Sequence, residues 1–341
     1  MISKIIAEDL ITKVKKAIDN VDKIVIVAHV GPDGDALGAS LALWHYLMTI
    51  DKEPVVIVPN PFPNFLTWMP GAECILDYDN SKEKADELFA SAELIFTLDF
   101  NTASRMGKMA DAVINASADK ILVDHHLHPD AFAKIKVSYP EMSSTSEMIF
   151  RLICRMGDFS KINLACAECI YTGMMTDTGG FTYNSNNHEI YTIISELIKI
   201  GVDKDDIYRK VFNTYSEDRL RLMGFCLYHK MKVYKEYRTA LITLTKEELA
   251  QFNYIIGDSE GFVNIPLSIA GVDFSVFMRE DGDRLKISFR SQGTFPSNKV
   301  AADLFNGGGH LNASGGETSL TLTEAVKKFE DALPDYKDFL E

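Results

Sequence analysis

The sequence predicts an α/β protein with an N-terminal, doubly wound parallel-sheet domain and a smaller C-terminal α/β domain with a mixed or antiparallel sheet. Three observations predict this class. The chain has 341 residues, more than one hydrophobic core usually serves. In its first half, short β-branched runs alternate with amphipathic segments, whereas a later part shows two-residue alternation and a hairpin signal.

The N-terminal domain is expected over residues 1–190. A mixed-charge helix is expected within Met1–Asn20. The strand and helix runs after it recur roughly every 25 to 30 residues, which is typical of a parallel sheet with helices on both faces. The expected strands are Lys23–His29, Val55–Val58, Leu94–Phe100 and Ile121–His125, with helices at Leu37–Leu47 and Lys82–Ala90. Such sheets bind ligands at the carboxyl ends of their strands.

The sequence pattern changes after this domain. Residues 191–220 are expected to form a helical linker, and 221–341 a C-terminal substrate-binding domain. Lys232–Leu244 alternates, and Phe274–Met278 faces Leu285–Phe289 across Asp281-Gly282, a hairpin signal.

Composition excludes several classes of function. Thirty-five lysines and arginines stand against 49 aspartates and glutamates, a net charge of −14, which argues against gripping long nucleic acid. No run approaches the roughly 20 apolar residues that span a bilayer, so no membrane partner and a cytoplasmic location are expected. The five scattered cysteines indicate a reducing compartment and no disulfide framework.

Carboxylates and imidazoles stand at the ends of the expected strands and in two acidic turns. They are His29, Asp33, Asp35, Asp99, Asp124, His125, His126 and Asp177. Each has a separate structural explanation; Asp35, for example, could cap the helix after it. Together, so many buried carboxylates would repel one another unless cations neutralised them. Nitrogen and hard-oxygen ligands suit Mn²⁺ or Mg²⁺.

The order of these residues resembles the DHH phosphoesterase superfamily. The series His29-x-x-x-Asp33-x-Asp35, Asp99, Asp124-His125-His126 and Asp177 is similar to its successive motifs. The run G-G-G-H-L-N-A-S-G from Gly307 to Gly315 is similar to the signature of the associated C-terminal domain. Together they cover nearly the whole chain, whose size and two-domain layout are similar to the nanoRNase and pAp phosphatase branch.

The resemblance implies two Mn²⁺ ions, with Mg²⁺ as the alternative. It implies that His29, Asp33 and Asp99 hold one ion, and that Asp35, Asp99, His125 and Asp177 hold the other, so that Asp99 bridges. It further implies that His126 faces the substrate phosphate or assists the leaving group, and that Asp124 orients the neighbouring histidines.

A substrate clamp is expected mainly in the C-terminal domain. Gly307–Gly309, including Gly308 and Gly309, could present amides as an anion nest, with a plain tight turn as the alternative. His310 adds a donor beside it. By its place in the resemblance, Arg290 is the expected phosphate-binding arginine, and Arg105 is a further candidate.

The leading hypothesis is hydrolysis of short oligoribonucleotides to 5′-mononucleotides, with pAp, converted to AMP, as a second candidate substrate. The alternative within the same class is a phosphodiesterase for c-di-AMP or pApA. An alternative of another class is a non-catalytic nucleotide sensor. A homodimer is compatible with the resemblance. The segment Ser143–Glu147 could cap a helix beginning near Met148 and also aim hydroxyls at the site.

Overall fold

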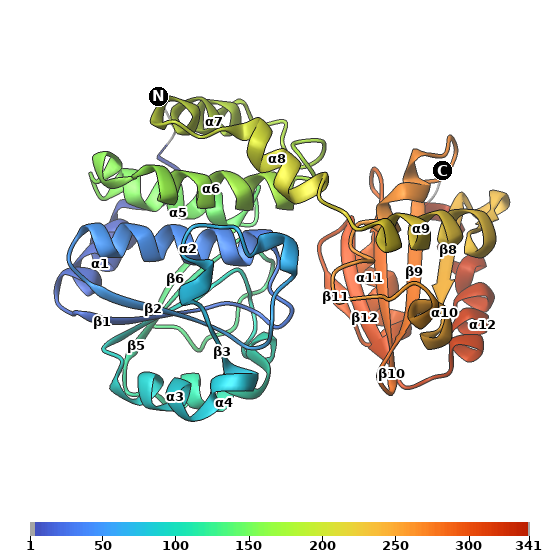
Figure 1. The fold of residues 1–341 in the computed structure, drawn as a ribbon, viewed down its shortest axis with the longest axis horizontal. Coiled ribbons are helices and arrows are strands. Elements are labelled where there is room, and N and C mark those ends of the chain that lie inside the picture. The colour runs from blue at the N-terminus through green and yellow to red at the C-terminus, as the bar shows by residue number, and fades with distance from the viewer. Residues whose placement is uncertain (1–3, 340–341) are drawn as a thin grey trace. The chain divides into compact units, whose positions relative to one another are not determined.

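The computed structural model describes residues 4–339. The chain forms two compact units, Met1–Thr214 and Tyr215–Glu341, which Figure 1 shows as ribbons. The boundary at 214/215 falls inside the segment 191–220 that was expected to be a linker. The helical run expected there is present as two helices, α7 (His188–Ile200) and α8 (Lys204–Phe212), and both belong to the first unit.

The first unit contains a six-stranded, fully parallel sheet with strand order β3-β2-β1-β4-β5-β6. Its elements in chain order are α1 (Glu8–Asp19), β1 (Lys23–Val27), α2 (Gly34–Thr49), β2 (Glu53–Val58), β3 (Leu76–Asp77), α3 (Tyr78–Ser91), β4 (Leu94–Leu98), α4 (Ala110–Asn115), β5 (Asp119–Asp124), β6 (Ile135–Ser138), α5 (Thr145–Arg155), α6 (Leu164–Asp177), α7 (His188–Ile200) and α8 (Lys204–Phe212). The predicted doubly wound fold is confirmed.

Both faces of this sheet are covered, because successive strand residues point to opposite sides. Ile24 and Ile26 of β1 enter a core shared with α1, α2, α5 and α6, whereas Val25 and Val27 pack with α3 and α4. Figure 1 shows α3 and α4 on one side of the sheet and α2, α5 and α6 on the other. The strand order reverses between β1 and β4, and ligands of such folds bind at the carboxyl ends of the strands beside this switch point.

Helices α2 and α6 approach closely because glycines face each other. A methyl group added at Gly38 would lie 2.7 Å from the Cys169 carbonyl oxygen and 2.8 Å from the Gly173 Cα atom. No larger residue fits without movement of one helix. This contact brings together Asp35, in the first turn of α2, and Asp177, at the end of α6.

The second unit contains a six-stranded mixed sheet with strand order β11-β12-β10-β9-β8-β7. Its elements are α9 (Glu217–Phe225), a π-helical turn (Cys226–Lys230), β7 (Lys232–Tyr234), β8 (Thr239–Leu244), α10 (Lys246–Gln251), β9 (Phe274–Asp281), β10 (Arg284–Ser291), α11 (Ser297–Phe305), β11 (Gly308–Gly309), β12 (Ala313–Thr318) and α12 (Leu322–Ala332). Strands β8 and β9 are parallel and the other pairs antiparallel.

The hairpin expected around Asp281-Gly282 joins β9 and β10, with Gly282 at a φ of 62°. Residues 232–244, expected as one alternating run, form two strands, because Arg238 adopts a φ of 43° and turns the chain between them. Within residues 4–339, no helix is long and apolar enough to cross a membrane.

Candidate active site

The carboxyl end of the first sheet gathers the polar residues of the N-terminal motifs. His29 lies two residues after the end of β1 and Asp99 directly follows β4, the two strands at the switch point, and Asp124 ends β5. Asp33 is the N-cap of α2. Ligand atoms lie within 4.8 Å of one another in three groups: His29 with Asp33 and Asp99, Asp35 with His125 and Asp177, and Asp99 with Asp124 and His126.

Asp99 lies between His29 and the group of Asp35, His125 and Asp177. Its Oδ2 lies 3.5 Å from His29 Nε2, and its Oδ1 lies 3.5 Å from His125 Nε2. One carboxylate oxygen therefore faces each cluster, which is the arrangement that a bridging carboxylate requires.

The spacing between donor atoms fits a bound cation better than direct hydrogen bonds. His29 Nε2 lies 3.8 Å from Asp33 Oδ2, and His125 Nε2 lies 3.4 Å from Asp177 Oδ2 and 4.0 Å from Asp35 Oδ2. Good N–H···O hydrogen bonds are about 2.9 to 3.0 Å long. Two ligand atoms that each lie about 2.1 Å from one ion are roughly 3.0 to 3.5 Å apart in octahedral or tetrahedral coordination. The donor set thus needs only small movements to hold ions.

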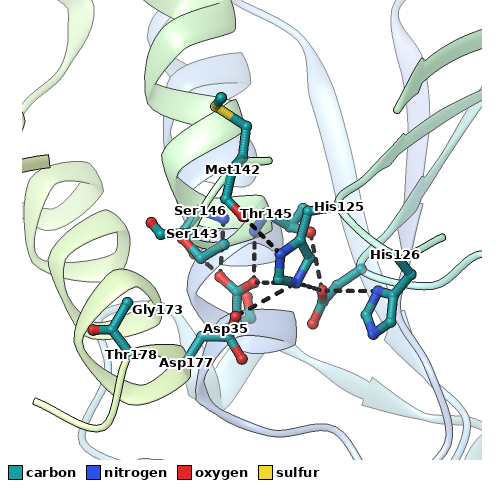
Figure 2. A network of polar contacts seen from close by, with 12 residues as sticks. Asp35, His125, His126, Met142, Ser143, Thr145, Ser146, Gly173, Asp177 and Thr178 are labelled. Atoms are coloured by element: carbon teal, nitrogen blue, oxygen red, sulfur yellow. Dashed lines mark hydrogen bonds and ion pairs between the residues drawn. The ribbon is translucent and has the colours of Figure 1, made fainter. Parts of the chain in front are cut away.

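Backbone carbonyls orient the rings of both histidines. His29 Nδ1 lies 3.0 Å from the Val30 carbonyl oxygen, and His125 Nδ1 lies 3.2 Å from that of Met142. A carbonyl can only accept, so in the neutral ring Nδ1 carries the hydrogen and Nε2 keeps its lone pair. In each case this lone pair points toward carboxylates, as Figure 2 shows for His125.

The buried carboxylates and imidazoles of this site shift one another's pKa values, and a bound cation would offset the charge of the carboxylates. Burial of Asp35, together with the charges of Asp99 and Asp177, raises the pKa of its carboxyl well above the usual range. Burial of His29 favours its neutral form, but the contacts with Asp33 and Asp99 outweigh this and raise its pKa to about 10. Divalent cations held by these groups would offset the charge of the carboxylates.

Asp99 has an unusual backbone. Its φ is 65°, in the left-handed region that non-glycine residues seldom occupy. Its amide is bonded to the Val123 carbonyl oxygen at 3.1 Å. Residues held in such conformations are concentrated at functional sites, and here the turn aims the carboxylate between His29 and His125.

Asp124 holds the ring of His126. Asp124 is fully buried, and its Oδ1 lies 2.7 Å from His126 Nδ1. The His126 side chain is one-fifth exposed. The carboxylate fixes the ring orientation, which is the contact that the expected orienting role requires.

The N-terminus of α5 also contacts this site. The sequence indicated a helix cap and nearby hydroxyls here, but not the contact of the backbone amides with Asp35. The helix begins at Thr145 and not near Met148, because the Ser144 side chain caps it by accepting from the Glu147 amide. The amides of Thr145 and Ser146 donate to the two carboxylate oxygens of Asp35. The run of hydroxyl residues is the only sequence signal of this contact.

Arg105 lies on a 3-10 segment, Ala103–Met109, that follows β4. Its carbonyl oxygen accepts from the Val30 amide at 2.7 Å, so its backbone braces the loop after His29. The Arg105 side chain is exposed.

The clamp residues expected in the second unit gather around the β11–β12 hairpin. Arg290 pairs with Ala313 in the sheet, and the His310 amide donates to the Ala313 carbonyl oxygen at 2.7 Å. The Gly307 amide already donates to the Ala301 carbonyl oxygen. The expected nest is therefore incomplete: Gly307 is committed to the fold, and Gly308 and Gly309 form a short strand.

Comparison with known proteins identifies both domains. The N-terminal domain of the DHH family matches residues 23–174, and the DHHA1 domain matches 242–340. The bifunctional oligoribonuclease and PAP phosphatase NrnA of Thermus thermophilus is 30% identical over 326 residues, 95% of this chain and 92% of that protein. The cyclic-di-AMP phosphodiesterase GdpP of Bacillus subtilis is 22% identical over 94% of this chain but only 49% of its own length.

A solved structure extends the comparison. An exopolyphosphatase-related protein from Bacteroides fragilis is 62% identical, with a TM-score of 0.96 and 99% of both chains covered. Two domains matched in order, and relatives that extend over nearly the whole chain, place this protein in the DHH family of metal-dependent phosphoesterases.

Proposed function

We propose that this protein is a two-metal phosphoesterase that hydrolyses short oligoribonucleotides to 5′-mononucleotides and also converts pAp to AMP. The observation that carries the proposal is at the switch point of the sheet, where one oxygen of Asp99 faces His29 and the other faces the cluster of Asp35, His125 and Asp177. The substrate class is supported by the oligoribonuclease and PAP phosphatase named among the relatives.

The proposed ligands of one ion are His29, Asp33 and Asp99. Those of the other are Asp35, Asp99, His125 and Asp177. Two such ions, with Mn²⁺ favoured over Mg²⁺, would lower the pKa of a bound water and offset charge on the attacking and leaving oxygens of a phosphate ester.

The protein's own groups would handle the leaving group and the substrate phosphate. Asp124 Oδ1 accepts from His126 Nδ1, so in the protonated ring Nε2 would donate a proton or a hydrogen bond to the substrate. No nucleophilic side chain is needed, because water is the nucleophile.

Arg290, Gly308, Gly309 and His310 are proposed to bind a second phosphate of the substrate. They gather around the β11–β12 hairpin, and the planar guanidinium of an arginine suits a phosphate. Arg105 is proposed to contact the phosphate backbone from the loop region after β4. An acidic chain with a net charge of −14 favours short substrates over long ones, because long nucleic acid is held by many cationic contacts.

The second candidate is hydrolysis of c-di-AMP, since a cyclic-di-AMP phosphodiesterase is also among the relatives. The test is hydrolysis with Mn²⁺ of pApA, an RNA pentamer, pAp, c-di-AMP, inorganic polyphosphate and a long single strand, side by side. We expect the highest kcat/KM for pApA and the pentamer, followed by pAp. Preference for c-di-AMP would replace the substrate assignment, and hydrolysis of none would support a sensor.

A further inference from the structure

Thr145 is bonded to two carboxylates of the metal centre at once. It is the first residue of α5 and is fully buried. Its amide lies 2.6 Å from Asp35 Oδ2, and its hydroxyl Oγ1 lies 2.9 Å from Asp99 Oδ1. Figure 2 shows Thr145 and Asp35 beside His125.

Both of these carboxylate oxygens face the same ring nitrogen. Asp99 Oδ1 lies 3.5 Å from His125 Nε2, and Asp35 Oδ2 lies 4.0 Å from it. The other Asp99 oxygen, Oδ2, faces His29. The Thr145 hydroxyl therefore contacts the Asp99 oxygen that faces the cluster of Asp35, His125 and Asp177.

The other oxygen of Asp35 is held by the next residue. The Ser146 amide donates to Asp35 Oδ1 at 2.9 Å, so two successive amides of α5 fix both oxygens of one carboxylate. The N-terminal amides and dipole of a helix favour a negative charge at this position. These amides orient both oxygens of Asp35 and leave further lone pairs available.

A buried ion network keeps Thr145 in place. Glu147 Oε2 accepts from the amide and the hydroxyl of Ser143, at 3.0 Å and 2.6 Å. Its other oxygen accepts from Arg151, which also contacts Glu189 of α7. The segment before the helix is thereby tied to the helix itself, so the Thr145 hydroxyl has little freedom to turn away.

Gly173 of α6 leaves the room that this arrangement needs. A methyl group at this position would lie 2.7 Å from Ser146 Cβ and 2.9 Å from Asp35 Oδ1. Helices α2, α5 and α6 thus meet where Asp35 is held.

We propose that Thr145 is a positioning residue that couples the two ion sites: its hydroxyl fixes the Asp99 oxygen facing His125 while its amide fixes Asp35. This inference rests on the proposed function. A hydroxyl that donates to one lone pair of Asp99 Oδ1 leaves the remaining lone pair, which would be available to an ion. Loss of the hydroxyl leaves Asp99 free to turn toward His29, which weakens the second site selectively.

The test compares Thr145→Val, which keeps shape and amide but removes the hydroxyl, with Thr145→Ser, which restores it. Thr172→Val is the matched control, because Thr172 is equally buried and its hydroxyl bonds only to the Glu168 carbonyl oxygen of its own helix. Mn²⁺ binding is measured by calorimetry, and coupling between the two ions by electron paramagnetic resonance. Thermal unfolding is recorded for every variant.

We expect two Mn²⁺ per wild-type chain with a spin-coupled spectrum. In Thr145→Val the second ion should bind about 10-fold more weakly or worse, the range typical of lost outer contacts to ligands, and the coupled signal should fall. Thr145→Ser and Thr172→Val should resemble wild type. Equal affinity and coupling in Thr145→Val would overturn the inference while leaving the proposed function intact. A wild type that binds no Mn²⁺ pair would overturn both.

Discussion

Asp99 is the residue on which the two clusters depend. Its left-handed backbone, with a φ of 65°, places one carboxylate oxygen toward His29 and the other toward His125. Asparagine also tolerates this backbone conformation. Substitution by asparagine therefore removes the charge with little effect on the turn.

At the same scale, the proposed roles of Arg290 and His310 concern substrate binding and not the chemical step. Arg290→Ala and His310→Ala should each raise KM for pApA about 10-fold or more, since a charge-assisted hydrogen bond contributes about 1.5 to 3 kcal/mol. The kcat should change much less, because neither residue is proposed to act at the reacting phosphorus. Arg290→Lys is the control for charge without the planar fork. Normal KM values in both alanine variants would remove the clamp from the account.

The cysteines should differ sharply in reactivity. Cys74 is exposed, whereas burial raises the pKa of Cys154, Cys166 and Cys226 to about 12. At pH 8 a thiol with that pKa is ionised only about one part in 10⁴, and the thiolate is the reactive form. A disulfide reagent should therefore titrate one thiol quickly and the others only after unfolding. Rapid reaction of two or more thiols in the native protein would contradict this.

The residues gathered at the sheet edge could be proposed from sequence because strand ends of a parallel sheet share one edge. Thr145 was harder to assign, because its partners Asp35 and Asp99 are distant along the chain and a hydroxyl run indicates a helix cap just as well. Gly173 gave only the weak signal of a glycine inside a helix. The amide of Gly307 was expected to face a phosphate, but it closes a bond to Ala301.

At the scale of elements, the packing of α2 on α6 sets the width of the site. Gly38→Ala should lower the free energy of unfolding by about 1 to 3 kcal/mol, the usual cost of overpacking, because its methyl group would meet the Cys169 carbonyl. Urea unfolding followed by circular dichroism measures this. Gly224→Ala is the control, since space is open around Gly224 in α9. Equal stability of the two variants would contradict the proposed close approach.

Element boundaries followed the sequence where apolar runs were long. The strand cores of β1, β2, β4 and β5 could be predicted from β-branched runs. Strand β3 was missed because Leu76–Asp77 is too short to show a period. The start of α5 was placed late because side-chain capping by Ser144 adds a turn of helix that no apolar periodicity marks.

At the scale of the whole molecule, each unit has its own interior. Two hydrophobic clusters lie within the first unit and two within the second. The change from helix-strand alternation to two-residue alternation predicted this division in the sequence. The pattern did not reveal that β8 and β9 run parallel, because pairing direction depends on the long connection between them.

Metal binding should therefore stabilise the units unequally. Mn²⁺ at about 100 times its Kd adds about 2.7 kcal/mol per ion, which raises the unfolding temperature of a unit of this size by about 5 to 10 °C. Calorimetry should show this rise in the component assigned to residues 1–214 and little change in that of 215–341. A C-terminal component that rises as much as the N-terminal one would contradict a centre built by the first unit alone.

We propose that paired cations held through Asp99 promote the hydrolysis of a phosphodiester. The most direct measurement is the Mn²⁺-dependent release of AMP from pApA by the wild type and by Asp99→Asn, with circular dichroism to confirm that both are folded. We expect turnover by the wild type and its loss on chelation of the metal. In Asp99→Asn the rate of AMP release should fall by at least about 10³-fold, which corresponds to a loss of about 4 kcal/mol of transition-state stabilisation. Turnover by Asp99→Asn at the wild-type rate would contradict the two-metal mechanism.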